Sequence, residues 1–254
     1  MLTAAGITSI AAPAVGATAE KGKPMSYAEV RDFLSRHTRI VELSDDRGSR
    51  VCVCPQWQGR VMTSTYSGAD GPSFGFVNRR VIDAGISDAR LNNYDGEERM
   101  WLSPEGGQFS LWFKPGAKQT LDNWYTPPAL NEGAWSVEES SAQMCRMAAD
   151  MRLQNASAAE FRVKVQRTVQ MLSPADLEKL LGEQVGRLLA GGDVKMVAYQ
   201  TVNRITNCGR PMTREKGLLS IWILGMFNAG PQTVVVVPYR AGHLSQLGPP
   251  VKSD

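Results

Sequence analysis

The sequence has 254 residues, of which 43% are hydrophobic and 21% charged, and its formal net charge is +3. This composition is typical of a globular protein that is long enough to build a sizeable core. The basic residues are spread along the chain, which argues against a nucleic-acid-binding face. No apolar run is long enough to cross a bilayer, so the sequence predicts no membrane span.

Residues 1–24 are rich in small apolar side chains and reach Ala17-Thr18-Ala19 just before the polar Glu20. An A-x-A pattern followed by a polar start indicates the cleavage site of a secretory signal, although a basic leading region is missing. The alternatives are a signal-peptide remnant whose true start lies upstream and a disordered Ala-rich arm. We favour the first, which predicts a periplasmic or secreted protein with a single domain over residues 25–254.

A short helix is predicted over residues 26–37. Ser26 is followed three residues later by Glu29, which is a capping box, and Val30, Phe33, Leu34 and His37 share one helical face.

Strand patterns dominate from residue 38 onward, with a second helix predicted from the Ser173-Pro174 N-terminal signal into residues 177–185. The predicted strands alternate apolar and polar side chains or form short continuous apolar runs. They lie within 38–66 (three strands), 101–113 (strand, turn, strand), 161–172, 194–207, 217–227 and 232–240.

The absence of regular helix–strand alternation argues against a parallel α/β sheet. The sequence therefore predicts an all-β, mainly antiparallel sandwich with two short helices. The chain stops in a Gly/Pro loop directly after its two most core-like strands, and a buried strand needs a neighbour or a covered edge. We therefore expect a C-terminally incomplete domain, with further strands downstream.

Four cysteines are present. Cys52 and Cys54 are two residues apart in a predicted strand, so they share a face and are expected to be reduced core residues. A bridge between Cys145 and Cys208 remains an open alternative for an exported protein. No second C-x-C or histidine cluster completes a metal site, and we predict neither a metal nor a cofactor.

The stretch from Asp95 to Phe113 combines four acids, one arginine and two tryptophans around a turn at Pro104–Gly107. Carboxylates hydrogen-bond sugar hydroxyls, and indole rings stack on apolar sugar faces. The stretch therefore suggests a carbohydrate site, and the alternative is a plain β-hairpin with a solvated turn.

Two groups of site residues follow from this stretch and from nearby loops. Glu105 could serve as a general acid or base if its pKa is raised, or it could be an exposed turn acid. Arg99 could hold a sugar hydroxyl, or it could pair with Glu97 or Glu98. Trp101 is a stacking candidate, although tryptophan in a strand is more often core. The candidates are Glu105 and Glu97 as catalytic carboxylates, and Arg99, Trp57, Asn78, Trp101, Gln108 and Trp124 as substrate-binding residues.

Several segments together resemble an uncharacterised bacterial family that is found often in exported proteins. They are residues 51–65, 72–82, 92–113, 123–128, 195–207 and 217–240. That family is similar in turn to the galactose mutarotase (aldose 1-epimerase) superfamily. The resemblance implies a β-supersandwich of the galactose mutarotase-like type, with a sugar-binding groove on the concave face of one sheet.

Mutarotases use a glutamate and a histidine on opposite sides of the sugar ring, and here the match breaks. The chain has two histidines, His37 and His243, and neither falls in a segment that matches a mutarotase catalytic histidine. Three hypotheses follow: a sugar-binding protein without catalysis, a carbohydrate-active enzyme (epimerase, hydrolase or lyase) that uses Glu97 and Glu105, and a structural sandwich without a small ligand. The sequence predicts neither the sugar nor the oligomeric state.

Overall fold

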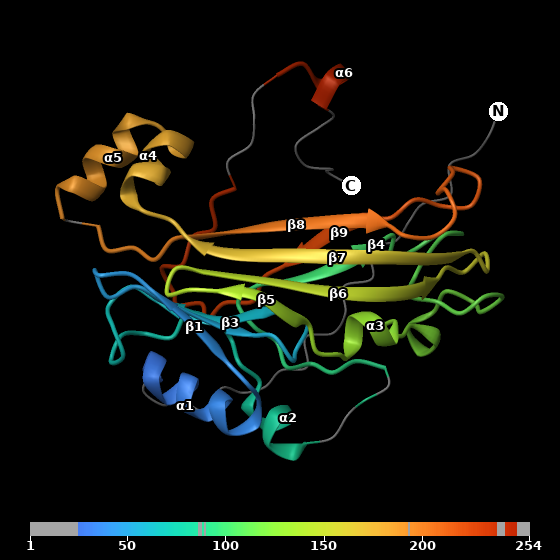
Figure 1. Cartoon of the computed structure of the whole chain (residues 1–254), viewed down its shortest axis with the longest axis horizontal. Coiled ribbons are helices and arrows are strands. Elements are labelled where there is room, and N and C mark those ends of the chain that lie inside the picture. Colours follow the sequence, from blue (N-terminus) through green and yellow to red (C-terminus); the bar gives the residue numbers. More distant parts are fainter. Residues whose placement is uncertain (1–24, 86–87, 89, 193, 238–241, 248–254) are drawn as a thin grey trace.

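The computed structural model describes residues 25–85, 88, 90–192, 194–237 and 242–247 (Figure 1). The predicted signal remnant, residues 1–24, lies outside the described residues. The chain forms three antiparallel sheets in a sandwich-like arrangement, which confirms the predicted all-β, mainly antiparallel fold.

The strands belong to three sheets, ordered β1-β2-β3, β4-β9 and β5-β6-β7-β8. Their bounds are β1 Val41–Ser44, β2 Arg50–Cys54, β3 Arg60–Thr65, β4 Arg99–Ser103, β5 Ser136–Ser140, β6 Met144–Gln154, β7 Glu160–Met171, β8 Tyr199–Asn207 and β9 Ser220–Leu224. The helices are α1 Tyr27–His37, α2 Arg79–Ala84, α3 Pro128–Asn131, α4 Pro174–Leu181, α5 Glu183–Ala190 and α6 Leu244–Leu247, with a 3₁₀ turn at Leu121–Asn123.

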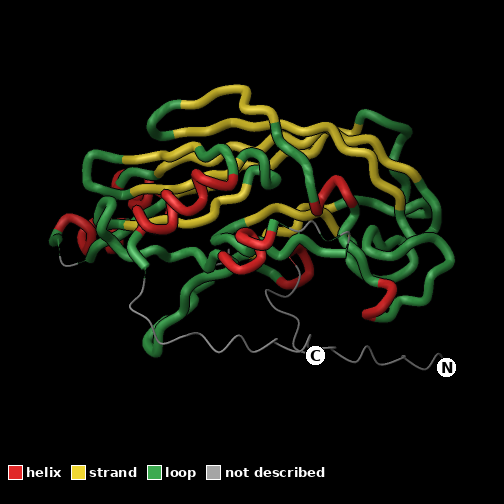
Figure 2. Tube along the Cα trace, turned by 90° about the horizontal axis from the view of Figure 1, so that it is seen from below, coloured by secondary structure: helices red, strands yellow, loops and turns green. Residues whose placement is uncertain are grey.

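Two layers of strands enclose the main core (Figures 1 and 2). The four-stranded sheet forms one layer, and Val163, Val165 and Val169 of β7 contribute to the core. The other layer contributes Val51 and Val53 of β2, together with residues of β3 and β4. The start of β4 is joined to β3 by an antiparallel bridge between Glu98 and Val61, so the two smaller sheets meet at this point.

Helix α1 covers the outer face of the β1-β2-β3 sheet. Its predicted capping box is confirmed, because Ser26 Oγ accepts a hydrogen bond from Glu29 N and Glu29 Oε2 accepts one from Ser26 N. Phe33 and Leu34 of this helix pack with Cys52 and Cys54, in a second core cluster. This arrangement confirms that both cysteines share one buried face.

The four cysteines are all free thiols. Cys145 is buried within β6, whereas Cys208 is exposed just after β8, so the alternative of a Cys145–Cys208 bridge is wrong.

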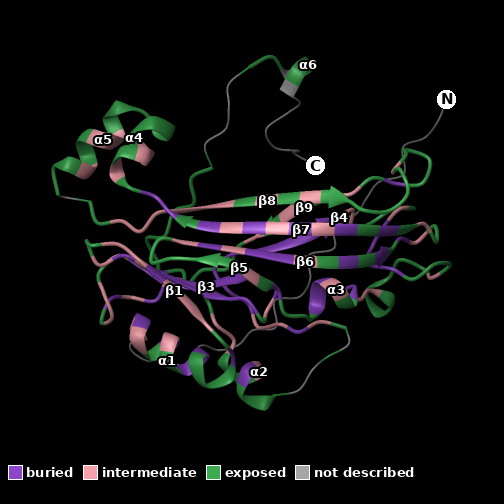
Figure 3. Ribbon diagram, viewed as in Figure 1, coloured by how far each residue is buried: buried purple, intermediate pink, exposed green. Residues whose placement is uncertain are grey.

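Strand β7 shows the predicted alternation over its whole length, with every second side chain buried (Figure 3). It pairs with β6 on one side and β8 on the other, and each strand is antiparallel to its neighbour. Because one face of the sheet meets the core and the other meets solvent, the sequence period of two is retained.

The predicted hairpin over residues 101–113 is wrong in its second half. Strand β4 pairs with β9, with Trp101 opposite Trp222, instead of with residues 110–113. Leu111, Trp112 and Phe113 are all buried, which a strand with one solvated face does not allow. Trp112 Nε1 instead donates to the Leu102 carbonyl, 3.2 Å away, so this segment folds back over the end of β4.

The predicted fully buried strand at 217–227 is shorter and less buried than expected. Only β9 forms, with Trp222 and Leu224 packed against the core and Ile221 and Ile223 exposed. Its one strand partner among the described residues is β4. Because one face of this two-stranded sheet is not covered, the side chains of the continuous apolar run alternate between partly buried and exposed.

The strand predicted over residues 232–240 does not form in its described part. Val234–Val237 pair with no strand in the described part of the chain and are between 75% and 81% exposed. Their strong β propensity is therefore not sufficient, because a strand needs a paired neighbour.

The predicted second helix is divided at Gly182, whose φ of 99° ends α4 before α5 begins. Helices α2, α3 and α6 also form in addition to the two that the sequence predicts.

Candidate functional site

A pocket of about 530 Å³ lies where β3, the start of β8 and the segment before β8 meet. Its lining contains one glutamate, one lysine, one serine, two tyrosines, two phenylalanines and three apolar residues. These residues are Ser64, Tyr66, Phe74, Glu97, Lys195, Met196, Val197, Ala198, Tyr199 and Phe227. The pocket therefore combines polar and aromatic lining groups.

A sharp turn before β4 directs Glu97 to this pocket. Asp95 and Gly96 both have positive φ, 62° and 114°, and a side chain on Gly96 would approach Met62 Sδ to 3.1 Å. After the turn, Glu97 N donates to the Met62 carbonyl at 3.2 Å. The chain thus joins the edge of β3 at the residue whose carboxylate reaches the pocket.

The Glu97 carboxylate is buried and half satisfied. Its Oε1 accepts hydrogen bonds from Ser64 Oγ at 2.7 Å and from Tyr199 Oη at 3.0 Å. Its Oε2 is buried without a hydrogen-bond partner among the described residues. Burial raises the pKa of Glu97, while the bonds from Ser64 and Tyr199 lower it. Such a group can accept a hydrogen bond from a ligand hydroxyl, and a raised pKa is typical of carboxyls that exchange protons in catalysis.

Tyr199 is the second polar group of the pocket. Burial raises the pKa of its phenol, and the nearby carboxylates of Glu97 and Glu98 raise it further. The phenol therefore stays protonated at neutral pH and donates to Glu97.

Behind the pocket, Glu98 and Arg167 form a buried two-pronged ion pair. The two guanidinium nitrogens lie 2.7 and 3.1 Å from the two carboxylate oxygens. Arg167 is fully buried and also donates to the Gly59 carbonyl at 2.9 Å and to Asn203 Oδ1 at 2.8 Å. This network connects β7 and β8 to the start of β4, so it fixes the layer that carries Glu97 against the layer that carries Tyr199.

The aromatic wall comes from three separate segments. The Tyr66 and Phe74 rings lie 5.6 Å apart, and Phe227 is 54% exposed. Gly75 bridges to Phe227, and Asn228 Nδ2 donates to the carbonyls of Ser73 and Gly75 at 3.0 and 2.9 Å. A side chain on Gly75 would lie 2.0 Å from the Met62 carbonyl oxygen, so glycine permits this close approach.

The sequence matches a family of unknown function (DUF6786) over residues 25–253. The chain belongs to this family. Comparisons with curated proteins and with solved structures found no similar protein. The family assignment thus confirms the resemblance to an uncharacterised family and leaves the similarity to mutarotases as a hypothesis.

In this member of the family, the predicted site residues lie in three separate places, and Glu97 is the one that lines the pocket. Arg99 pairs with neither Glu97 nor Glu98 among the described residues. Its guanidinium instead lies 4.0 Å from the centre of the Trp101 ring, close to the Asp95 carboxylate.

Asn78 and Trp57 belong to the region around Asp95. Asn78 caps α2, with its side chain accepting from Val81 N at 3.3 Å. Trp57 stacks on Tyr94 with ring centres 4.6 Å apart and packs against the cluster beneath α1. Neither residue lines the pocket. Their contacts show structural roles: Asn78 caps a helix and Trp57 packs in the core beneath α1.

The Asp95 carboxylate itself is buried with neither oxygen in a hydrogen bond of good geometry. Burial raises its pKa to about 6, although Arg99, Arg60 and the Asn78 side chain favour the charged form.

Glu105, Trp124, Trp101 and Gln108 lie around the far end of β4. Glu105 is an exposed turn residue whose Oε1 accepts from Trp124 Nε1 at 3.1 Å. Trp124 stacks on buried Trp112 with ring centres 5.2 Å apart, and Trp101 is a core residue. Gln108 is exposed, and its carbonyl accepts from Ser157 Oγ. The alternative of a solvated turn therefore describes Glu105 best.

Six residues that line the pocket are not among those predicted from the sequence: Ser64, Tyr66, Phe74, Lys195, Tyr199 and Phe227. Tyr199 and Lys195 stand in a segment that was expected to be one continuous strand, 194–207. The structure keeps 194–198 irregular, and this part of the segment forms the pocket wall. The sequence feature that could have indicated a site here is the pair of polar residues, Lys195 and Tyr199, that flank the apolar residues 196–198.

Within the described part of the chain, no helix combines the length and apolar composition needed to span a membrane. The same residues contain no group of three or more histidine, cysteine, aspartate or glutamate side chains that could hold a metal ion.

Proposed function

We propose that the pocket around Glu97 binds a carbohydrate. The observation that carries the proposal is the buried Glu97 carboxylate, which has one oxygen held by Ser64 and Tyr199 and the other without a partner. An unpaired buried oxygen is costly. This oxygen is covered by protein atoms, so a ligand hydroxyl reaches it only as the pocket wall shifts, and the hydrogen bond that then forms removes the cost.

The other walls suit the same ligand class. Tyr66, Phe74 and Phe227 offer aromatic faces for the apolar side of a sugar ring, and all three line the same pocket as Glu97. A volume of about 530 Å³ lies within the range of about 300–1,000 Å³ that is usual for small-molecule sites. The resemblance of residues 92–113 to the mutarotase superfamily supports a sugar independently of the pocket.

The test is a glycan array followed by calorimetry on the hits, using the full chain. Glu97→Gln should weaken binding at least tenfold because the amide cannot present two acceptor oxygens. Phe227→Ala should weaken it by a smaller factor, about two- to twelvefold, since stacking on aromatic rings contributes about 0.5–1.5 kcal/mol beyond buried area. Phe227→Ala should keep the melting temperature of the parent, because Phe227 is 54% exposed. Glu97→Gln removes a buried charge, so its binding is measured below its own melting temperature.

Glu105→Gln is the matched control, because Glu105 is an exposed acid outside the pocket. It should bind sugar like the parent protein. If binding is lost in Glu105→Gln and kept in Glu97→Gln, the ligand sits at the Pro104–Gly107 turn and the proposal is wrong. If no glycan binds, the carbohydrate function itself is wrong.

Catalysis on the bound sugar is a second candidate, and the raised pKa of Glu97 is the observation that favours it. A carboxyl that titrates near the working pH can act as general acid or base. Tyr199→Phe removes one of the hydrogen bonds that lower this pKa, so the Glu97 pKa should rise further. Carboxyl ¹³C NMR titration measures the shift, and an unchanged pKa would exclude the Tyr199 contribution.

We further propose that the protein acts outside the cytoplasm. The support is the A-x-A pattern that ends at Ala19, followed by polar residues. Terminal sequencing of the mature protein after expression with its full leader tests this proposal. A mature chain that begins after Ala19 is the expected result, and an uncleaved chain retained in the cytoplasm would contradict it.

A further inference from the structure

A second cavity adjoins the Glu97 pocket. It has a volume of about 320 Å³ and shares Tyr66, Lys195 and Met196 with the pocket. Its other walls are Arg47, Ser67, Pro174, Leu189 and Val194. The two spaces are therefore neighbours in one groove that runs over Lys195.

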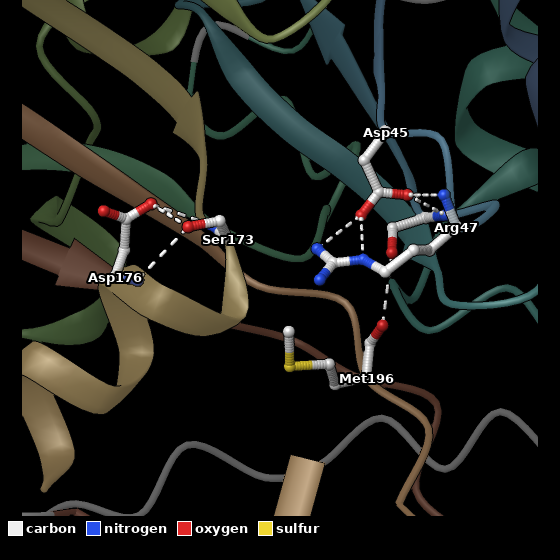
Figure 4. A network of polar contacts seen from close by, with 6 residues as sticks. Asp45, Arg47, Ser173, Asp176 and Met196 are labelled. Carbon is white, nitrogen blue, oxygen red and sulfur yellow. Dashed lines mark hydrogen bonds and ion pairs between the residues drawn. The ribbon is translucent and has the colours of Figure 1, made fainter. Parts of the chain in front are cut away.

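The wall between the two cavities is held in place by hydrogen bonds to its backbone carbonyls. Ser49 Oγ donates to the Met196 carbonyl at 3.2 Å (Figure 4). Leu172 N donates to the Ala198 carbonyl at 2.9 Å. The same figure shows the Ser173–Asp176 cap, with 2.6 Å between Ser173 Oγ and Asp176 Oδ2, which fixes the first turn of α4 where Pro174 lines the second cavity. Hydrogen bonds therefore fix the segments that form the groove on both sides of Lys195.

The charges along the groove are uneven. The lining of the second cavity contains two cations, Arg47 and Lys195, and no acid. Arg47 is paired with Asp45 at 2.9 Å, whereas Lys195 has no ion-pair partner among the described residues. Lys195 is exposed, and its Nζ lies 5.8 Å from the centre of the Tyr66 ring. The ammonium group is therefore available to a ligand at the boundary between the cavities.

We infer that the ligand is an acidic oligosaccharide of at least two rings, with a carboxylate or sulfate group that contacts Lys195. This inference rests on the proposed function and deepens it. One ring occupies the Glu97 pocket, where its hydroxyl donates to the free carboxylate oxygen. The next ring enters the second cavity, where its anionic substituent meets Lys195, with Arg47 at the far wall.

The experiment compares matched saccharides that differ at one substituent. Disaccharides and trisaccharides of the gluco, galacto and manno series are measured in three forms: neutral, with the C6 hydroxymethyl oxidised to a carboxylate, and with the C6 hydroxyl sulfated. Calorimetry at 50 mM and 500 mM salt gives each affinity. The proteins are the parent chain, Lys195→Gln and the control Lys118→Gln, because Lys118 is exposed and lines neither cavity.

An anionic member that binds at least tenfold more tightly than its neutral counterpart supports the inference. The preference should fall at high salt, disappear in Lys195→Gln and persist in Lys118→Gln. The carboxylate and sulfate arms then identify which group is recognised. Equal affinity for neutral and anionic members, or a preference that survives in Lys195→Gln, overturns the inference while sugar binding stands. Binding of no saccharide at all overturns the proposed function as well.

Discussion

Replacing Asp95 by asparagine should stabilise the protein at neutral pH. Burial raises the pKa of the Asp95 carboxyl to about 6 from an ordinary value of 3.8, and its oxygens lie in no hydrogen bond of good geometry. Asparagine has the shape of the protonated acid and tolerates the positive φ of 62° at this position. The substitution therefore removes a buried charge without changing the turn that positions Glu97.

Proton linkage determines how the free energy of unfolding changes with pH. Because the pKa is higher in the folded than in the unfolded state, the native protein binds more protons between about pH 4 and pH 6. Stability is lost as the pH rises through that window, and the loss is complete above pH 6. A difference of about two pH units corresponds to about 3 kcal/mol.

Urea unfolding followed by circular dichroism at pH 4, 5, 6, 7 and 8 measures the effect. Asp95→Asn should gain about 2–3 kcal/mol at pH 7 and nothing at pH 4. Asp70→Asn, at an exposed turn residue, is the control and should follow the parent at every pH. A loss of stability in Asp95→Asn at pH 7, or a difference that is the same at pH 4 and pH 7, would refute the reasoning.

Two further substitutions test the structure around the pocket. Arg167→Met should destabilise the protein by about 3–5 kcal/mol, because it leaves the buried Glu98 unpaired, and adding Glu98→Leu should restore at least half of the loss in urea unfolding. A cost below about 1 kcal/mol would contradict a buried pair. Gly75→Ala should cost about 2–4 kcal/mol, because its Cβ would lie 2.0 Å from a backbone oxygen. Gly106→Ala, whose nearest neighbour would lie 3.9 Å away, should melt like the parent; equal losses in both would refute the packing argument.

The local sequence pattern was sufficient to predict a helix or strand, and its buried face, wherever one face of that element is apolar. The α1 capping box, the shared face of Cys52 and Cys54 and the alternation of β7 all depend on neighbours within a few residues, and all three are confirmed. Glu97 was also identified as a candidate, because its acid stands in an unusual stretch, and the structure places it in a pocket.

Pairing and burial over long distances were not predictable in the same way. Strand β4 pairs with β9, more than a hundred residues away, because Trp101, Trp112 and Trp222 pack together there. A single sequence does not encode that choice in any local period. The same tertiary packing left Glu105 on an exposed turn, although its sequence context is as suggestive as that of Glu97.

The sequence by itself determined the all-β class, the capped first helix and the inward face of its most regular strand. Each follows from side-chain periodicity and local capping, which act between near neighbours. Only the tertiary structure decided that Glu97, and not Glu105, lines a pocket. The turn at Asp95–Gly96 sets Glu97 against Ser64 of one sheet and Tyr199 of another, and only the packing of two layers brings those three residues together.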